Sequence, residues 1–387
     1  MRTGETAGRM DGRNVGGTDG LKFGRCDALN VSVTTALEDS AWDAFLKSTP
    51  FGEYPQSSVW ARYKHTDGWR CSRTLIKRGQ RITGGFQVLW RPTRFGRIGY
   101  VSKGPVAEAE KPELVDALVG LLIRAAKKLR LTALVVHPPG SSRSIAACLP
   151  VNSFAPNRML DLITSSLTID LAAGMEAIEA RVKKTRRNLV RQAVRHGVVI
   201  REGGEQDIGS FFHLMLKSCR RQGVDPNPST EAALRELWRA SRAAGGCRLT
   251  IAECDGRPVS GLFCLLFGKV VTIWKKGSSP EHLHLHAVDL LYHETLSWAS
   301  SQGFRFCDFG SLSRRTAEDM NKGLTLSEAQ PASRDFFHIS FGGTPILLPE
   351  AYLHFPNPLL GWAYRLMTGN ECVLRWLKKA ARKLEGG

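Results

Sequence analysis

Negative charge is scarce in this sequence. The chain has 36 Asp and Glu residues against 54 Lys and Arg residues, which gives a formal net charge of +18 and an isoelectric point near 9.8. Such an excess of positive charge indicates an anionic partner. Nucleic acid, an anionic lipid surface and a polyphosphate substrate all remain open, because net charge carries no information about fold.

Long apolar runs are missing as well. No stretch approaches the roughly 20 apolar residues of a membrane-spanning helix, so we do not expect an integral membrane protein. The first twenty residues are polar and rich in glycine, and they lack the apolar core of a signal peptide. We therefore expect residues 1–25 to form a disordered tail and the protein to be cytoplasmic.

The sequence also lacks cysteine pairs with a recognisable spacing. The nine cysteines are scattered, and no two of them stand at C-x-x-C spacing. Their number is odd, and Cys254, Cys264 and Cys307 lie inside strand-like apolar runs. These features favour reduced thiols in the core of a cytoplasmic protein over a disulfide framework.

The 387 residues are enough for two domains, with ordinary proportions of apolar (42%) and charged (23%) residues. Apolar periodicity predicts the same succession of elements in both halves: antiparallel strands, then a helix, then one more strand. The first copy comprises strands at 71–77, 82–91 and 97–102, a helix at 112–130 and a strand at 131–137. The second comprises strands at 248–253, 259–267 and 270–275, a helix at 287–301 and a strand at 305–309.

This succession is the core of the GNAT acyltransferase fold, and the two copies lie about 165–170 residues apart. The predicted fold class is α/β with mixed α+β sheets, arranged as two tandem GNAT-like acyltransferase domains. We place the first domain at 26–160 and the second at 161–345. Residues 346–387 are predicted to be a helical extension that packs on the first domain or on a membrane surface, because 359–384 form a basic amphipathic pattern with tryptophan.

The most basic stretch, residues 176–200, reads as one helix followed by a strand. Apolar residues recur at helical spacing, and cations spaced four apart form a ridge on another face. Like charges at this spacing repel one another, so the ridge favours a polyanion as partner, although a solvated face is the alternative. The expected polyanion-binding residues are Lys183, Lys184, Arg187, Arg191 and Arg195, with Arg186 widening the positive surface.

Several segments in this order resemble the FemAB group of aminoacyltransferases, which form peptidoglycan bridges and consist of two GNAT-like domains. The similarity covers about residues 40–350. The segments that carry it are WARYKHTDGWRCSRTLIKRGQRITGGFQVLWRP, YVSKGPV at 100–106, SSLTIDL at 165–171 followed by KKTRRNLVRQAVRHGVVI, FCDFGSLS, and FFHISFGG. Each motif alone is weakly specific, but the ordered set is fairly specific.

The resemblance implies acyl transfer from aminoacyl-tRNA to an amine of a cell-envelope precursor, without a metal or a cofactor. His338 stands where the family usually has lysine, so the resemblance implies that it is an acid/base or a cation near the developing oxyanion. Asp308 is the best candidate carboxylate, although it could equally be a turn-capping residue that holds Gly310. Expected substrate-binding residues are Lys103, Arg220, Arg221, Trp274 and Lys275, with a core position as the alternative for Trp274.

Two other functions remain open. Acyl-CoA-dependent N-acylation of an amino sugar would keep the fold, but the loops before the two main helices, 103–106 and 278–282, lack the glycine pattern that binds pyrophosphate. A catalytically degenerate relative that binds RNA or anionic lipid is the non-enzymatic alternative. His282, His284 and His286 would share one face if extended, but no recognised metal spacing surrounds them, and we expect loop residues there.

Overall fold

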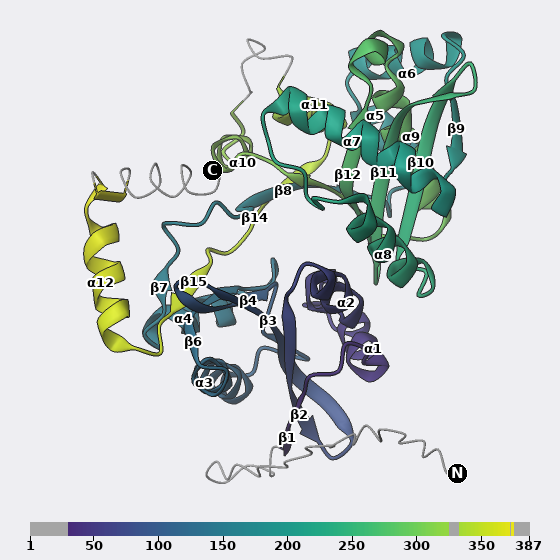
Figure 1. Ribbon diagram of the computed structural model, residues 1–387. Helices are drawn as coiled ribbons and strands as arrows, with labels where there is room; N and C mark the ends of the chain where they lie inside the picture. The colour runs from purple at the N-terminus through teal and green to yellow at the C-terminus, as the bar shows by residue number, and fades with distance from the viewer. Residues whose placement is uncertain (1–29, 325–332, 372, 375–387) are drawn as a thin grey trace, which may run out of the picture.

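The structure, a computed structural model, describes residues 30–324, 333–371 and 373–374. The chain forms two α/β domains, each built on a mixed sheet (Figure 1). Within the described residues, no helix is long and apolar enough to span a bilayer. The expected tail at 1–25 lies outside these residues, as does most of the basic pattern predicted near the C-terminus.

The first sheet has the strand order β1-β2-β3-β4-β6-β15-β7, with β5 paired to β3. Strands β1 to β4 form an antiparallel meander, and β4 then runs parallel to β6. Helix α3 covers one face, and its leucines pack on the valines of β3, β4 and β6. The bounds are β1 Asn30–Thr34, β2 Arg70–Arg78, β3 Arg81–Thr93, β4 Gly96–Ser102, β5 Val106–Ala107, α3 Pro112–Lys128, β6 Leu131–His137, α4 Ser144–Val151 and β7 Ala155–Pro156.

The second sheet has the order β14-β8-β13-β12-β11-β10-β9. One face packs on α5, α6 and α9, and the other packs on α7 and α8. The bounds are β8 Ser165–Asp170, α5 Gly174–Arg181, α6 Lys184–Arg195, β9 Val199–Glu202, η2 Glu205–Asp207, α7 Ile208–Gln222, α8 Glu231–Arg242, β10 Cys247–Cys254, β11 Arg257–Phe267, β12 Val270–Ser278, η3 Pro280–Leu285, α9 Ala287–Ser301, β13 Phe306–Ser311, α10 Arg314–Asn321, α11 Arg334–Ile339 and β14 Thr344–Leu347.

The central parallel strand pair differs between the two domains. In the first domain, β4 and β6 stay paired from Arg97 to Ser102, the whole length of the strand. In the second, β12 pairs with β13 only over Val270–Thr272. Beyond Thr272, β12 continues beside β11 while β13 continues beside β8. The sheet of the second domain therefore opens between β12 and β13, and the sheet of the first does not.

The basic stretch is not one helix, so this prediction was wrong. It forms α5 and α6, separated by Val182 and Lys183 in extended conformation. The backbone N–H of Lys183 donates to the carbonyl of Ser340, beyond α11, at 2.9 Å. This contact outside the helix takes the place of the intrahelical bond, and it brings the start of α6 next to α11.

The end of the chain returns to the first domain. Strand β15 (Tyr352–His354) lies between β6 and β7, so residues 346–387 are not simply a helical extension. Helix α12 (Pro358–Gly369) then runs along the side of the first domain (Figure 1). The Tyr364 hydroxyl donates to the carbonyl of Pro156 at 3.0 Å and fixes α12 against β7.

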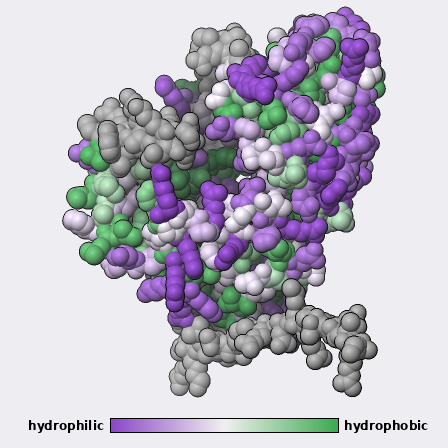
Figure 2. Space-filling view, in the orientation of Figure 1, coloured by the Kyte–Doolittle hydropathy of each residue, from purple (hydrophilic) through white to green (hydrophobic). Residues whose placement is uncertain are grey.

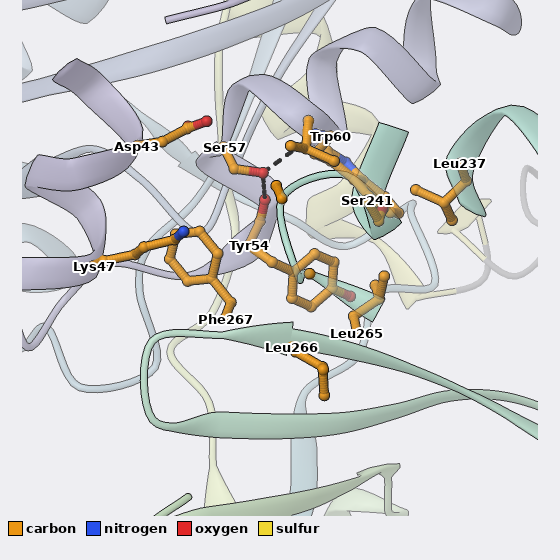
Figure 3. Close-up of a pocket in the computed structure, with 13 residues that line it drawn as sticks. Asp43, Lys47, Tyr54, Ser57, Trp60, Leu237, Ser241, Leu265, Leu266 and Phe267 are labelled. Atoms are coloured by element: carbon orange, nitrogen blue, oxygen red, sulfur yellow. Dashed lines mark hydrogen bonds between the residues drawn. The ribbon is translucent and has the colours of Figure 1, made fainter. Parts of the chain in front are cut away.

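The two domains share a packed junction. Three short elements between β1 and β2 reach the second domain: α1 (Ser40–Ser48), η1 (Tyr54–Gln56) and α2 (Ser58–Thr66). Tyr63 of α2 is completely buried within the core cluster of the second domain. A small cavity of about 50 Å³ remains at this junction, where Tyr54 and Trp60 face Leu237 and Leu265 (Figure 3). The junction fixes the position of first-domain side chains beside the second sheet.

Candidate functional site

The candidate site lies where the two domains face each other, at the opening between β12 and β13. The surface of the molecule is hollowed between the domains (Figure 2). Asp308 of β13 pairs with Thr272, the last residue of β12 in register with β13. Its neighbours Cys307 and Phe309 are buried in the core cluster that includes α9. Because side chains alternate along a strand, Asp308 points to the opposite face, toward the first domain.

The carboxyl group of Asp308 has an unusual protonation equilibrium. Its Oδ1 accepts a hydrogen bond from the Gly310 N–H at 2.8 Å. Asp308 therefore caps this turn, as the alternative interpretation of the sequence predicted. Burial raises the pKa of Asp308 to about 6, the Glu53 carboxylate adds to this shift, and the Lys103 ammonium opposes it. A carboxylate with this pKa can accept a proton near neutral pH.

Lys103 reaches the site from the end of β4 in the first domain. Its backbone has a positive φ of 54°, which is uncommon for a residue with a side chain. Gln56 holds the preceding residue, since its Nε2 donates to the carbonyl of Ser102 at 2.6 Å. The Lys103 Nζ is buried and has no hydrogen-bond partner among the described residues. A buried, unsatisfied ammonium beside Asp308 is suited to holding an anionic group of a ligand.

Three residues of the site are surrounded by protein on most sides but remain accessible to solvent. Tyr54, Lys276 and Asp308 each keep some solvent-accessible surface. Burial is nevertheless the largest cause of the pKa shift of each, and it raises the pKa of the Tyr54 hydroxyl well above its usual range. Groups at the bottom of a narrow cleft have both properties, because protein surrounds them on most sides while one side stays open.

Lys276 is the principal cation on the other side of the opening. The pairing register of β11 with β12 shifts between Phe263 and Cys264, so β12 has a bulge shortly before Lys276. Its Nζ lies 5.0 Å from the centre of the Phe337 ring of α11. Burial lowers the pKa of Lys276 to about 8, and the charges of Arg221 and Arg334 add to this shift. Lys276 is not among the residues predicted from the sequence, where its one sign is a second lysine next to Lys275 within an apolar strand.

A buried ion pair supports this side of the site. Arg186 of α6 bonds to Asp289 of α9, and its Nε donates to the Ser340 hydroxyl at 2.9 Å. Its guanidinium lies 4.5 Å from the centre of the Phe337 ring. The expectation that Arg186 widens an exposed surface is therefore wrong. Its position, four residues after Val182 and three before Leu189, belongs to the apolar stripe, and this spacing could have indicated burial.

His338 is not a cation. It is buried on α11 among aromatic rings, with ring centres at 5.8 Å for Phe309 and 6.2 Å for Tyr292. Burial lowers its pKa to about 3, and the charges of Lys276 and Arg334 lower it further. A neutral imidazole cannot supply positive charge to an oxyanion at pH 7, so that part of the expectation is wrong. In this part of the site the positive charge comes from Lys276, Arg221 and Arg334.

The other expected substrate-binding residues divide into two groups. Arg221 contributes to the electric field at Lys276, and Arg220 is exposed beside it; both lie in the last turn of α7. Trp274 belongs to the junction, with its ring edge-on to Trp60 and Tyr63, both at 6.0 Å. Lys275 lies over Trp274 at 5.0 Å. Trp274 therefore packs in the core between the domains, which is the alternative to substrate binding given for it in the sequence analysis.

The cations expected to bind a polyanion surround the start and outer side of α6. Lys183, Lys184, Arg191 and Arg195 are exposed, and Arg187 is partly exposed. Arg187 donates to the carbonyl of Glu179 at 2.9 Å, and Lys183 lies over the Phe336 ring at 4.6 Å. Because Phe336 is on α11 beside His338, this ridge begins next to the candidate site.

The loop between β12 and α9 is a short helix that contains an ionised carboxylate. It forms the 3-10 helix η3, so His282 and His284 are not in the extended conformation that would align them for a metal. Glu281 accepts a hydrogen bond from the Ser279 hydroxyl, and this bond lowers its pKa to about 2. Within the described residues, no group of three His, Cys, Asp or Glu side chains is arranged to hold a metal ion. The Glu281 carboxylate also pairs with the Lys217 ammonium at 3.3 Å, so this cation is already engaged by the protein.

Comparison with known families supports the resemblance found in the sequence. Residues 37–149 match the FemAB family, and residues 179–317 match the acetyltransferase (GNAT) domain. The lipid II:glycine glycyltransferase of Staphylococcus epidermidis is 25% identical over 229 residues, which cover 56% of this chain and 55% of that protein. The UDP-N-acetylmuramoylpentapeptide-lysine N(6)-alanyltransferase of Weissella viridescens is 22% identical over 312 residues, or 75% of this chain and 88% of that protein.

Solved structures confirm the fold. The crystal structure of FemX superposes with a TM-score of 0.71 at 16% identity, covering 84% of this chain and 97% of that one. A tandem GNAT protein from the clavulanic acid biosynthesis pathway gives a TM-score of 0.52 at 12% identity, covering 85% and 99%. The α/β class and the tandem GNAT-like arrangement are thus confirmed. The chain matches only about half the length of the first of these curated relatives.

Proposed function

We propose, from a first half that is FemAB-like and a second half that is GNAT-like, that this chain is an N-acyltransferase. It would transfer an aminoacyl group from aminoacyl-tRNA to an amine of a peptidoglycan or related cell-envelope precursor. The named relatives support the type of acceptor, since one acts on lipid II and another on a UDP-linked muramoyl pentapeptide. The proposed location is the cytoplasm, at the inner face of the membrane.

The observation that carries the proposal is the pair of shifted groups at the opening between β12 and β13. Aminoacyl transfer forms a C–N bond and breaks the C–O ester bond, and the attacking ammonium must first lose a proton. Asp308, with a pKa of about 6, is the proposed base for that proton. Lys276 is the proposed cation that stabilises the oxygen of the tetrahedral intermediate. As the ester bond breaks, the ribose oxygen takes up the second proton that the attacking nitrogen loses. Because the nitrogen attacks the ester carbonyl directly, the transfer needs no covalent enzyme intermediate.

Two further residues are proposed to contact the acceptor. The unpartnered Lys103 ammonium and the exposed Arg221 lie on opposite sides of the opening, one from each domain. Phosphate or carboxylate groups of a cell-envelope precursor would pair with both. Arg220 is proposed as an outer contact of the same kind. Trp274 and Lys275, by their packing, are better suited to holding the domains together than to touching substrate.

The donor is proposed to be RNA rather than acyl-CoA. The loop where a GNAT protein would hold pyrophosphate lacks the glycine pattern, and the Lys217 ammonium beside it is already paired with the Glu281 carboxylate at 3.3 Å. The α6 ridge of Lys183, Lys184, Arg187, Arg191 and Arg195 instead offers positive charge beside the site. Replacing Lys183, Arg187 and Arg191 by Gln is expected to weaken tRNA binding, and to reduce the slope of log K against log salt by roughly 0.7–0.9 per lost phosphate contact. An unchanged salt slope would leave the ridge as a solvated face.

The proposed function is tested by offering both donors in parallel. The chain is incubated with UDP-linked muramoyl pentapeptide and either radiolabelled aminoacyl-tRNA or labelled acetyl-CoA, and label in the acceptor is measured. We expect transfer from tRNA and none from the Asp308→Asn variant. Transfer from acetyl-CoA alone would replace the proposal by acyl-CoA-dependent N-acylation. Transfer from neither donor, with salt-sensitive tRNA binding retained, would indicate a binding protein.

A further inference from the structure

Helix α12 turns large apolar side chains toward solvent, whereas an ordinary surface helix turns them toward the protein core. The residues that it turns toward the first domain are Gly361, Tyr364 and Thr368. The outward side presents Leu359, Trp362 and Leu366, which are 73%, 63% and 63% exposed. These three positions are spaced by three and four residues, so they lie on one side of the helix. We call them the α12 apolar face.

Neighbouring side chains enlarge this face. Leu360 and Met367 flank it and are also exposed. Val151 at the end of α4 is 80% exposed, and Arg365 links α12 to this region by donating to the carbonyl of Ser153 at 2.9 Å. In the space-filling view, apolar side chains gather along the edge occupied by α12 (Figure 2). Large apolar side chains that are exposed together on one side of a helix mark a docking surface.

Positive charges lie near the face, together with the acidic Glu371 just beyond the end of α12. Arg365 is the one charged residue within α12. Arg158 and Arg365 donate to the backbone carbonyls of Thr368 and Ser153, and in the described part of the chain neither forms an ion pair. In the sequence that follows α12, residues 370–387, basic residues outnumber acidic ones, with Arg375, Lys378, Lys379, Arg382 and Lys383 against Glu371 and Glu385. Positive charge beside an exposed apolar helix complements an anionic lipid surface.

We propose that the α12 apolar face docks on an anionic lipid bilayer, with the helix lying flat in the interface. Twelve residues of helix are about 18 Å long, too short for the roughly 30 Å hydrocarbon core, and the opposite side of α12 is fixed to the first domain. Leu359 and Leu366 enter the boundary between headgroups and acyl chains, and Trp362 takes the position that tryptophan favours there. The inference deepens the proposed location at the inner face of the membrane and rests on it, but its test requires neither donor nor acceptor and can fail separately from the acyl transfer.

The test is sedimentation of the full chain with vesicles of phosphatidylglycerol and phosphatidylcholine, compared with vesicles of phosphatidylcholine alone. We expect binding to the anionic vesicles, weaker binding to the neutral ones, and partial loss in high salt. The triple variant Leu359→Ser, Trp362→Ser and Leu366→Ser is expected to lower the partition coefficient by at least about tenfold, because each side chain forfeits apolar burial.

A matched control uses three exposed apolar residues of the second domain. Val194→Ser, Val199→Ser and Val224→Ser alter side chains that are similarly exposed but distant from α12, and this variant is expected to bind vesicles like the unmodified chain. Equal loss in both variants, or no vesicle binding by the unmodified chain, would overturn the proposal. It would also be overturned if light scattering showed a dimer that the α12 variant abolishes and vesicles failed to bind, because a second copy would then occupy the face.

Discussion

At the scale of single residues, the ionisable groups at the opening between β12 and β13 predict the pH dependence of the proposed reaction. Asp308 can accept a proton only when ionised, hence above its pKa of about 6. Lys276 is a cation only below its pKa of about 8. We therefore expect kcat/KM for aminoacyl transfer to follow a bell-shaped profile, with limbs near these two values.

Single substitutions assign the two limbs. Asp308→Asn should abolish most activity and remove the acidic limb from what remains, and Lys276→Met should remove the alkaline limb. Asp225→Asn and Lys269→Met change exposed groups outside the site and serve as controls. If Asp308→Asn retained full activity with both limbs, Asp308 would only cap the turn at Gly310.

The buried pair of Arg186 and Asp289 gives a prediction about stability. Removing one partner leaves the other charge buried without compensation, which typically costs about 3–5 kcal/mol. Arg186→Met and Asp289→Leu should each lower the free energy of unfolding by about that amount, measured by urea denaturation. The double variant should cost less than the sum of the two. Strictly additive losses would show that the two side chains do not act as a pair.

Motifs in the sequence singled out Asp308 and Lys103, and the structure brings their charges close enough to interact, while their roles at the site stay predictions. Their protonation could not be predicted from the sequence, because it depends on what surrounds each group after folding. His338 illustrates this limit, since its position near the site followed from a motif while its neutral state follows from the aromatic rings around it. Lys276 was missed because only the bulge in β12 explains its place at the site.

At the scale of elements, strands and helices with a strong apolar period were predictable almost to the residue. The strand Leu131–His137 and the helix Ala287–Ser301 have the predicted bounds. The break between α5 and α6 was not predictable, because the apolar spacing continues through Val182. It is caused by a distant segment, 340–342, whose backbone packs against Arg181 and bonds to Lys183.

Gly342 makes that contact possible and can be tested. Its φ is +78°, and a Cβ atom there would lie 2.6 Å from the Cβ and 2.7 Å from the carbonyl oxygen of Arg181. Gly342→Ala is therefore expected to cost about 2–4 kcal/mol of unfolding free energy. Gly323→Ala provides the comparison, because its φ is also positive but its added Cβ would meet nothing within 4 Å. Equal losses would mean that only backbone conformation matters at Gly342.

At the scale of the whole molecule, the site exists only because two domains are held in a fixed relation. Asp308 and Lys276 belong to the second domain, whereas Lys103 and Tyr54 belong to the first. The duplication was predictable from repeated strand and helix patterns. The junction was not, because it depends on α2 placing Tyr63 in the core of the other domain. The return of β15 to the first sheet was not predictable either.

Trp274 offers a test of this relation, since it packs edge-on against Trp60 and Tyr63 of the first domain. If it is a junction residue, Trp274→Ala should reduce stability by about 2–4 kcal/mol through lost packing, and it should split a single thermal transition into two, as the domains uncouple. Trp274→Phe should restore much of the loss because it keeps an aromatic edge. Trp362→Ala, at an exposed position, should leave the transition unchanged. If Trp274 instead contacts substrate, its replacement by Ala will raise KM while the calorimetric transition stays single and unshifted.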